Sequence, residues 1–128
     1  MEISLLIDGK PCHQKRHRHG RGRTYDPSKP EKNNVIKKIK SQYRGALIDV
    51  PITLIITAYY VPPKSYKIDV KSGLHYKQTT PDCDNIAKFY MDAMNKVVYA
   101  DDKLVASLSV TKMYHERDHV IIYISTLE

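Results

Sequence analysis

Four segments of the chain are rich in β-branched and other apolar residues, the pattern that is typical of β-strands. They are Ile3–Ile7, Ile52–Val61, Leu104–Tyr114 and Val120–Thr126. The second of them is expected at the centre of a sheet. Residues 116–118 are predicted to form the turn of a hairpin between the last two strands, and residues 97–99 are predicted to add a short strand.

Apolar residues at helical spacing predict two helices between these strands. The first begins near Pro30 and ends before Pro51, and its lysines, Lys32 among them, are expected on the face turned to solvent. The second is expected from residue 85 to about residue 96, with Asp84 as its N-cap. The order β-α-β-α-β-β predicts an α+β fold in which both helices pack on a small mixed sheet.

Two polar segments, at about residues 10–29 and 64–80, show no apolar period and are predicted to be loops. Loops of this length within a compact domain are usually functional or disordered. The whole chain of 128 residues is expected to form a single domain. The basic residues of the two loops, which we expect to contact DNA phosphates, are Lys15, Arg16, Arg18, Arg21, Arg23, Lys64, Lys67, Lys71 and Lys77.

Charge is distributed unevenly along the chain. Of its 21 basic and 14 acidic residues, residues 1–50 hold 12 and 5, and residues 82–128 hold 5 and 8. The first part therefore predicts a surface that faces a polyanion. The sequence contains no apolar run long enough for a membrane span, no recognisable signal peptide, and only two cysteines, so we expect a cytoplasmic protein without a membrane partner or a disulfide framework.

The acidic residues of the last third show a spacing that suggests a metal site. Asp82 and Asp84 precede the second predicted helix at positions i and i+2, so in extended backbone they point the same way. Lys88 follows one helical turn later, and Asp101 and Asp102 lie between two apolar segments, where a turn would bring another carboxylate back. Converging carboxylates need a cation, and hard oxygen ligands favour Mg²⁺, for which Mn²⁺ is expected to substitute.

Other interpretations of these residues were weighed. Asp84 and Asp82 are also what a capped helix start requires, with Lys88 as a solvated side chain. Tyr66 and Tyr76 on the second loop are candidates for stacking on unpaired bases. A zinc site is a further candidate, with Cys12, His13, His17 and His19 as its ligands. Structural zinc sites usually contain pairs of cysteines, and this segment has only one cysteine. Contact with DNA phosphates is therefore the preferred role of the three histidines.

Three segments in fixed order resemble the RusA family of Holliday junction resolvases. They are Pro81–Lys88, with its Asp-x-Asp-Asn-x-x-Lys pattern, then Asp92–Asn95, then Val98–Val105 with its Asp-Asp step. The stretch Arg18–Tyr25 is also similar to the early basic loop of that family. Met94 stands where the family usually has Leu, and Cys83 lies between the two aspartates.

The resemblance implies roles for individual residues. Asp82 and Asp84 match the metal-binding pair of the family, and Asp102 matches its third acidic residue, with Asp101 as a neighbour that assists. Lys88 matches the catalytic lysine. The resemblance also implies a homodimer, which agrees with the need to cut two opposed strands of a four-way junction.

Together these observations predict a homodimeric, Mg²⁺-dependent endodeoxyribonuclease that resolves four-way DNA junctions by paired symmetric nicks in recombination and repair. Two alternatives remain open at this point. One is a less selective nuclease that acts on flaps and forks. The other is a basic nucleic-acid-binding module whose aspartates only cap a helix.

Overall fold

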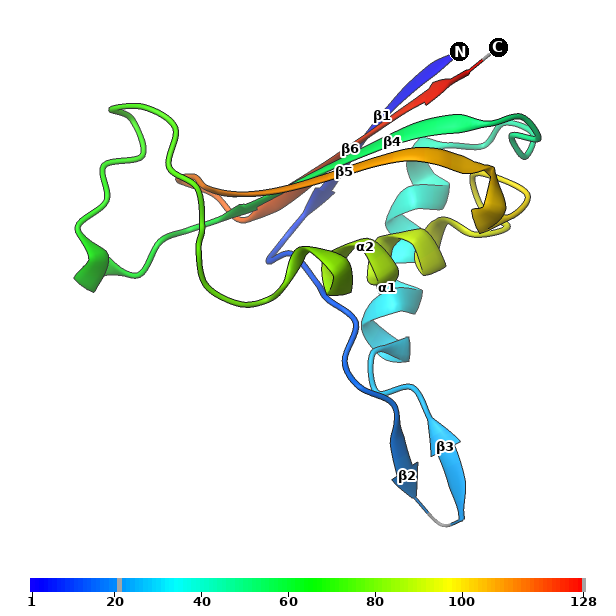
Figure 1. The fold of residues 1–128 in the computed structure, drawn as a ribbon, viewed down its shortest axis with the longest axis horizontal. Coiled ribbons are helices and arrows are strands. Elements are labelled where there is room, and N and C mark those ends of the chain that lie inside the picture. The colour runs from blue at the N-terminus through cyan, green and yellow to red at the C-terminus, as the bar shows by residue number, and fades with distance from the viewer. Residues whose placement is uncertain (21, 128) are drawn as a thin grey trace.

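The computed structural model describes residues 1–20 and 22–127, and its centre is a four-stranded mixed sheet (Figure 1). The strands are β1 (Glu2–Asp8), β4 (Ile52–Tyr60), β5 (Val105–Tyr114) and β6 (His119–Thr126), and their order in the sheet is β1-β6-β4-β5. β4 pairs with β5 in parallel and with β6 in antiparallel orientation, and β6 pairs with β1 in antiparallel orientation. The predicted α+β class and the central place of β4 are confirmed.

Two helices, α1 (Lys29–Gln42) and α2 (Cys83–Met94), lie on the same side of this sheet (Figure 1). Alternate residues of β4 are buried beneath them, as the period of two in a strand requires. Tyr60 is buried and Tyr59 lies on the opposite face of the strand, half-buried. Two short 3₁₀ helices complete the main body, η1 (Lys64–Tyr66) and η2 (Asp102–Leu104).

The predicted hairpin between the last two strands is wrong. β5 and β6 do not pair with each other, because β4 lies between them. The unit β4-α2-β5 is a crossover, which delivers β5 parallel to β4 on one side. The connection after β5 then crosses the end of β4, where the amide of His115 donates a hydrogen bond to the carbonyl of Tyr60 (2.8 Å), and β6 returns on the other side.

The first basic segment is more ordered than a plain loop. It contains a two-stranded antiparallel ribbon, β2 (Arg18–Gly20) and β3 (Arg23–Tyr25), which projects away from the sheet and the helices (Figure 1). Gly22 adopts a positive φ of 77° at its turn, a conformation that glycine reaches without strain. Arg21 lies outside the described residues.

Two smaller predictions also need correction. Residues 97–99 form no strand, and only isolated bridges join Tyr99 to Ile48 and Asn95. The second helix begins two residues earlier than predicted, with Asp82 rather than Asp84 at its N-cap position, and ends at Met94. No helix in the described part of the chain has the length and apolar character that crossing a membrane requires.

Candidate active site

The N-terminal end of α2 exposes the first pair of predicted acidic residues. Asp82 occupies the N-cap position in extended backbone but makes no side-chain capping hydrogen bond, and Asp84 lies in the first turn. The side chain of Asp84 is 68% exposed, and its carboxylate lies 3.9 Å from the ammonium of Lys88, one turn along the helix. The carboxylate of Asp82 therefore makes no capping hydrogen bond, and it can stabilise the helix end only through its charge.

Lys112 on β5 fixes the backbone that leads into Asp82. Its ammonium group donates hydrogen bonds to the carbonyl oxygens of Thr79 (2.7 Å) and Pro81 (2.9 Å). Lys112 was not among the functional residues predicted from the sequence. A signal was present, because alternation along β5 places Lys112 on the same face as Val110 and Tyr114, where an apolar side chain is the usual choice.

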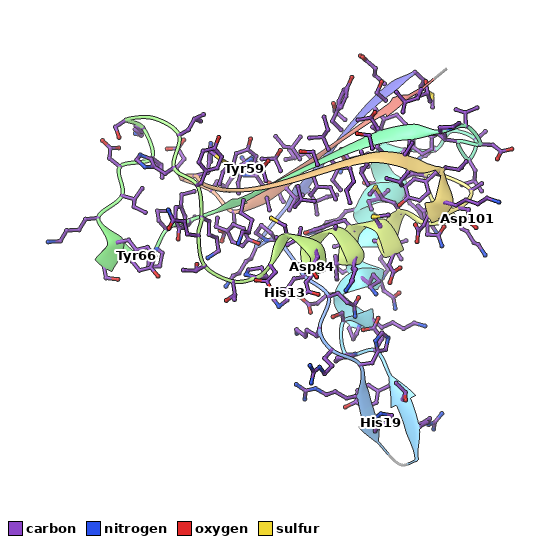
Figure 2. The ribbon with its side chains drawn as sticks, in the orientation of Figure 1. His13, His19, Tyr59, Tyr66, Asp84 and Asp101 are labelled. Atoms are coloured by element: carbon purple, nitrogen blue, oxygen red, sulfur yellow. The ribbon has the colours of Figure 1, made fainter. Side chains whose placement is uncertain are left out.

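The other predicted acidic residues gather at the far end of α2. Figure 2 shows Asp84 at the start of this helix and Asp101 beyond its other end. Asp92, on the third turn of α2, is close enough to Asp102 for its charge to act on that carboxyl. The helical rise alone separates Asp84 from Asp92 by about 12 Å. Within residues 1–20 and 22–127, no three His, Cys, Asp or Glu side chains lie close enough together to hold a metal ion.

The carboxylate of Asp102 is partly buried and incompletely hydrogen-bonded. Its Oδ1 atom is buried and has no hydrogen-bond partner in the part of the chain that the structure describes. Burial raises the pKa of this carboxyl above its usual range, and the negative charges of Asp92 and Asp101 add to the shift, while the hydroxyl of Tyr99 opposes it. A bound cation would offset the free-energy cost of holding a negative charge at this partly buried position. Carboxylate oxygens are the donors that Mg²⁺ and Mn²⁺ prefer, so the chemistry of these aspartates fits either ion, but those at the two ends of α2 do not converge within the described part of one chain.

A buried ion network joins the base of the β2–β3 ribbon to both helices. Lys32 on α1, expected on the solvent face, is instead buried, and its ammonium group contacts Gln14 (2.7 Å), Asp26 (2.8 Å) and Asp92 (3.1 Å). Burial opposes the ionisation of Asp26, but hydrogen bonds from Lys32, Ser28 and Gln14 outweigh it and lower the pKa of this carboxyl to about 2. The network thereby fixes the direction in which the ribbon leaves the body.

A cavity of about 580 Å³ opens beside Asp82. Its walls come from the segment that leads to the ribbon, the first turn of α1, the end of β4, the second basic loop and the start of α2. His13, which lines it, lies next to the start of α2 in Figure 2. The lining residues are Lys10, Pro11, His13, Lys15, Glu31, Tyr60, Lys77, Thr80, Pro81, Asp82 and Asn85.

The predicted DNA-contacting residues that the structure describes fall into four places. Arg18 and Arg23 lie on the projecting ribbon. A second groove along α2 is lined by Arg16 together with Lys88 and Asp92. The remaining lysines lie on the second loop or in the cavity; Lys64, Lys67 and Lys71 belong to the loop, and Lys15 and Lys77 line the cavity.

Two comparisons with known proteins bear on this arrangement. The family model for the endodeoxyribonuclease RusA matches residues 8–125, nearly the whole chain. The chain belongs to the RusA family. It is also 31% identical to an uncharacterized protein, YqaN, of Bacillus subtilis (strain 168), over 95% of this chain and 94% of that protein.

Membership confirms the resemblance seen in the sequence and gives the site its chemical context. RusA proteins are endodeoxyribonucleases that resolve Holliday junctions and generally depend on divalent metal ions. The matched region includes Asp82, Asp84, Lys88 and both aspartates of the Asp101–Asp102 step. The roles of these individual residues remain predictions.

Proposed function

We propose that this protein is a homodimeric, Mg²⁺-dependent resolvase that cuts four-way DNA junctions by paired symmetric nicks, with Mn²⁺ able to substitute. Its setting would be the cytoplasm, in recombination and repair. The observation that carries this proposal is the exposed pair Asp82 and Asp84, held by Lys112 at the start of α2 and bordered by the basic residues of two grooves. The RusA family supplies the reaction class.

In this proposal the acidic and basic residues of the site have separate roles. Asp82, Asp84, Asp101 and Asp102 would hold the metal ion, which when bound activates water and stabilises the leaving oxygen. Lys88, one turn after Asp84, would place its positive charge against the charge that develops on the phosphate oxygens. Arg16, on the wall of the same groove, would hold the DNA backbone along α2.

The placement of the acidic residues supports a dimer for this reaction. Asp84 and Asp101 lie at opposite ends of α2 in one chain (Figure 2). If one metal site uses both acidic groups, a second copy must supply one of them. A two-fold dimer built in this way has two equivalent sites, which is what two symmetric nicks require.

The shape and charge of the projecting β2–β3 ribbon support a role in DNA binding. A two-stranded ribbon has the width that the DNA major groove admits, and Arg18 and Arg23 carry positive charge along it. Affinity should fall steeply with salt, because each phosphate contact releases counterions. Replacing either arginine by Gln should reduce the slope of log Kd against log salt by about 0.9.

The experiment that tests the proposal is cleavage of a labelled four-way junction, with matched duplex and fork substrates. Wild type and Asp84→Asn are compared in Mg²⁺ and in EDTA. Symmetric nicks in the junction alone, absent in EDTA and in the variant, would support a resolvase. Equal cutting of forks would favour the less selective nuclease, and binding without any cutting, unchanged by the substitution, would favour the binding module.

A further inference from the structure

The cavity beside Asp82 contains a feature that metal binding does not use. Tyr60, at the end of β4, lines the cavity with only 4% of its surface exposed. Its hydroxyl group is buried and has no hydrogen-bond partner among the described residues. A buried hydroxyl without a partner costs stability, and such groups are rare in folded proteins. A ligand that enters the cavity with a hydrogen-bonding edge would remove this cost.

The same cavity carries the charges that bind a phosphate group. Lys10, Lys15 and Lys77 line it, and the ammonium group of Lys77 lies 5.0 Å from the centre of the Tyr60 ring. Lys15 is partly neutralised, because its ammonium lies 3.1 Å from the carboxylate of Glu31. No carboxylate pairs with Lys10 or Lys77 in the described structure; Lys77 donates one hydrogen bond to the hydroxyl of Thr79 (2.6 Å), which leaves its other two protons for an anion.

Two further lining groups are suited to recognition rather than to charge neutralisation. Asn85 presents a side chain that both donates and accepts hydrogen bonds, and its backbone carbonyl accepts a hydrogen bond from the amide of Gln14 (2.9 Å), which holds the two cavity walls together. His13 adds an aromatic ring. The volume of about 580 Å³ lies within the range of cavities that hold small ligands.

We propose that this cavity receives one unpaired nucleotide of the branched DNA, next to the phosphodiester that is cut. Lys10 and Lys77 contact its phosphate, and the hydroxyl of Tyr60 forms a hydrogen bond with the edge of its base. The proposal rests on the proposed function, since it places the nucleotide beside Asp82. It adds a residue that reads base identity, which phosphate contacts cannot do.

A branch point makes such a nucleotide available at low cost. Taking a base out of an intact duplex costs a few kcal/mol of stacking and pairing, and the cost is least where pairing is already disturbed. A nucleotide at the exchange point can therefore enter the cavity more easily than one in a linear duplex. Binding in the cavity would therefore favour junctions over linear duplex, and it would also favour some bases over others at the branch point.

The test combines a protein variant with a DNA variant. Tyr60→Phe removes only the hydroxyl group, and because that group has no partner, the thermal midpoint should not fall. Tyr59→Phe is the matched control, because Tyr59 lies on the opposite face of β4 and stacks on His119 with ring centres 4.4 Å apart. Junctions with a single abasic nucleotide, placed in turn at each position around the branch point, are bound in EDTA and cut in Mg²⁺.

One abasic position should weaken the binding of wild type and of Tyr59→Phe by about three- to tenfold, the effect of one hydrogen bond. Tyr60→Phe should bind the intact junction more weakly by that factor and should show a correspondingly smaller loss at the same abasic position, which is the coupling that a double-mutant cycle detects. The rates of cleavage for the four bases at that position should differ for wild type and become nearly equal for Tyr60→Phe.

Two results would overturn this inference and leave the proposed function intact. One is a junction that is bound and cut normally with no abasic position affecting wild type. The other is an abasic effect of the same size in wild type and Tyr60→Phe, which would show that the hydroxyl reads no base. A wild-type protein that neither prefers nor cuts junctions would instead contradict the proposed function itself.

Discussion

The two ends of helix α2 hold their aspartates in contrasting ways. At the N-terminal end, Asp82 and Asp84 are exposed, and the nearest positive charge to Asp84 is the loosely placed Lys88 at 3.9 Å. At the other end, Asp92 is held by Lys32 at 3.1 Å, and Asp102 is partly buried with one oxygen unpartnered. The carboxylates at the first end are open to a metal ion and to DNA, whereas at the second end the protein already engages Asp92 through Lys32 and partly buries Asp102.

This difference indicates how the chain separates stability from activity. Carboxylates that the protein itself stabilises contribute to folding, and carboxylates left without partners store a cost that a ligand can relieve. Substitutions at the two ends should therefore affect different measurements.

The largest expected effect comes from mixing two inactive chains. Asp84→Asn and Asp102→Asn should each reduce junction cleavage at least about 100-fold, because even residues that only support metal ligands contribute 10- to 100-fold. If each metal site takes Asp84 from one chain and Asp102 from its partner, a mixed dimer has one site with both substitutions and one with neither. Nicking of a single junction strand should then return, as a denaturing gel would show.

The mixing experiment can also contradict a metal site shared between two chains. If both aspartates of a site belong to the same chain, every site in the mixed dimer carries one substitution and no cleavage returns. Labelled chains and light scattering should verify that mixed dimers have formed. Renewed cutting with a monomeric protein would contradict the proposed dimer.

Lys32→Met should have the largest effect on stability. It leaves the carboxylates of Asp26 and Asp92 without their buried cation, and removing one partner of a buried ion pair costs about 3 kcal/mol. Urea unfolding measures the change. The control is Lys37→Met on the same helix, whose exposed lysine should contribute less than about 0.5 kcal/mol. Equal effects of the two substitutions would refute the role given to the network.

Lys112→Met should slow cleavage about tenfold, because Lys112 orients the backbone before Asp82 as residues behind metal ligands do. Junction binding in EDTA should change less than cleavage does. Lys112→Arg, which keeps a donor and the charge, should restore part of the rate. A loss of binding that matches the loss of cleavage would indicate that Lys112 contacts DNA instead.

The stability that Asp26 contributes should depend on pH. Because the folded protein lowers the pKa of Asp26 from 3.8 to about 2, its contribution is present above pH 4 and is lost as the pH falls toward 2. The unfolding free energies of wild type and Asp26→Asn should thus converge by about 1 kcal/mol over that interval, after solvent screening is allowed for. The exposed Asp49→Asn should show no such convergence. A difference that stays constant with pH would argue against the ion pair with Lys32.

The smallest effect should be a gain in stability. Asp102→Asn replaces a partly buried carboxylate, one oxygen of which lacks a hydrogen-bond partner among the described residues, by a neutral amide, so the metal-free protein should melt about 2 °C higher at neutral pH. Asp84→Asn, at an exposed position, should leave the melting temperature unchanged. Differential scanning calorimetry in EDTA compares them. A lower midpoint for Asp102→Asn would mean that its charge already has a stabilising partner.

Local patterns in the sequence determined much of this protein. The apolar run of β4 and the proline at the start of α1 are signals that act within a few residues, and each lies where the sequence indicated, whereas α2 begins two residues before its predicted start. The spaced motifs around Asp82 and Asp102 were enough to indicate the RusA family. These features could be predicted because strand alternation, helix period and motif spacing depend on residues that are close together in the sequence.

Only the tertiary structure decided which distant segments meet. It placed β4 between β5 and β6: the crossover through α2 sets β5 parallel to β4, and β6 pairs with the other edge of β4 instead of with its neighbour in sequence. It buried Lys32 against carboxylates from two other segments, and it turned Lys112 toward the carbonyls before Asp82. It also separated the acidic groups by the length of α2. Contacts between residues far apart in sequence leave no local period, so a single sequence could not show them.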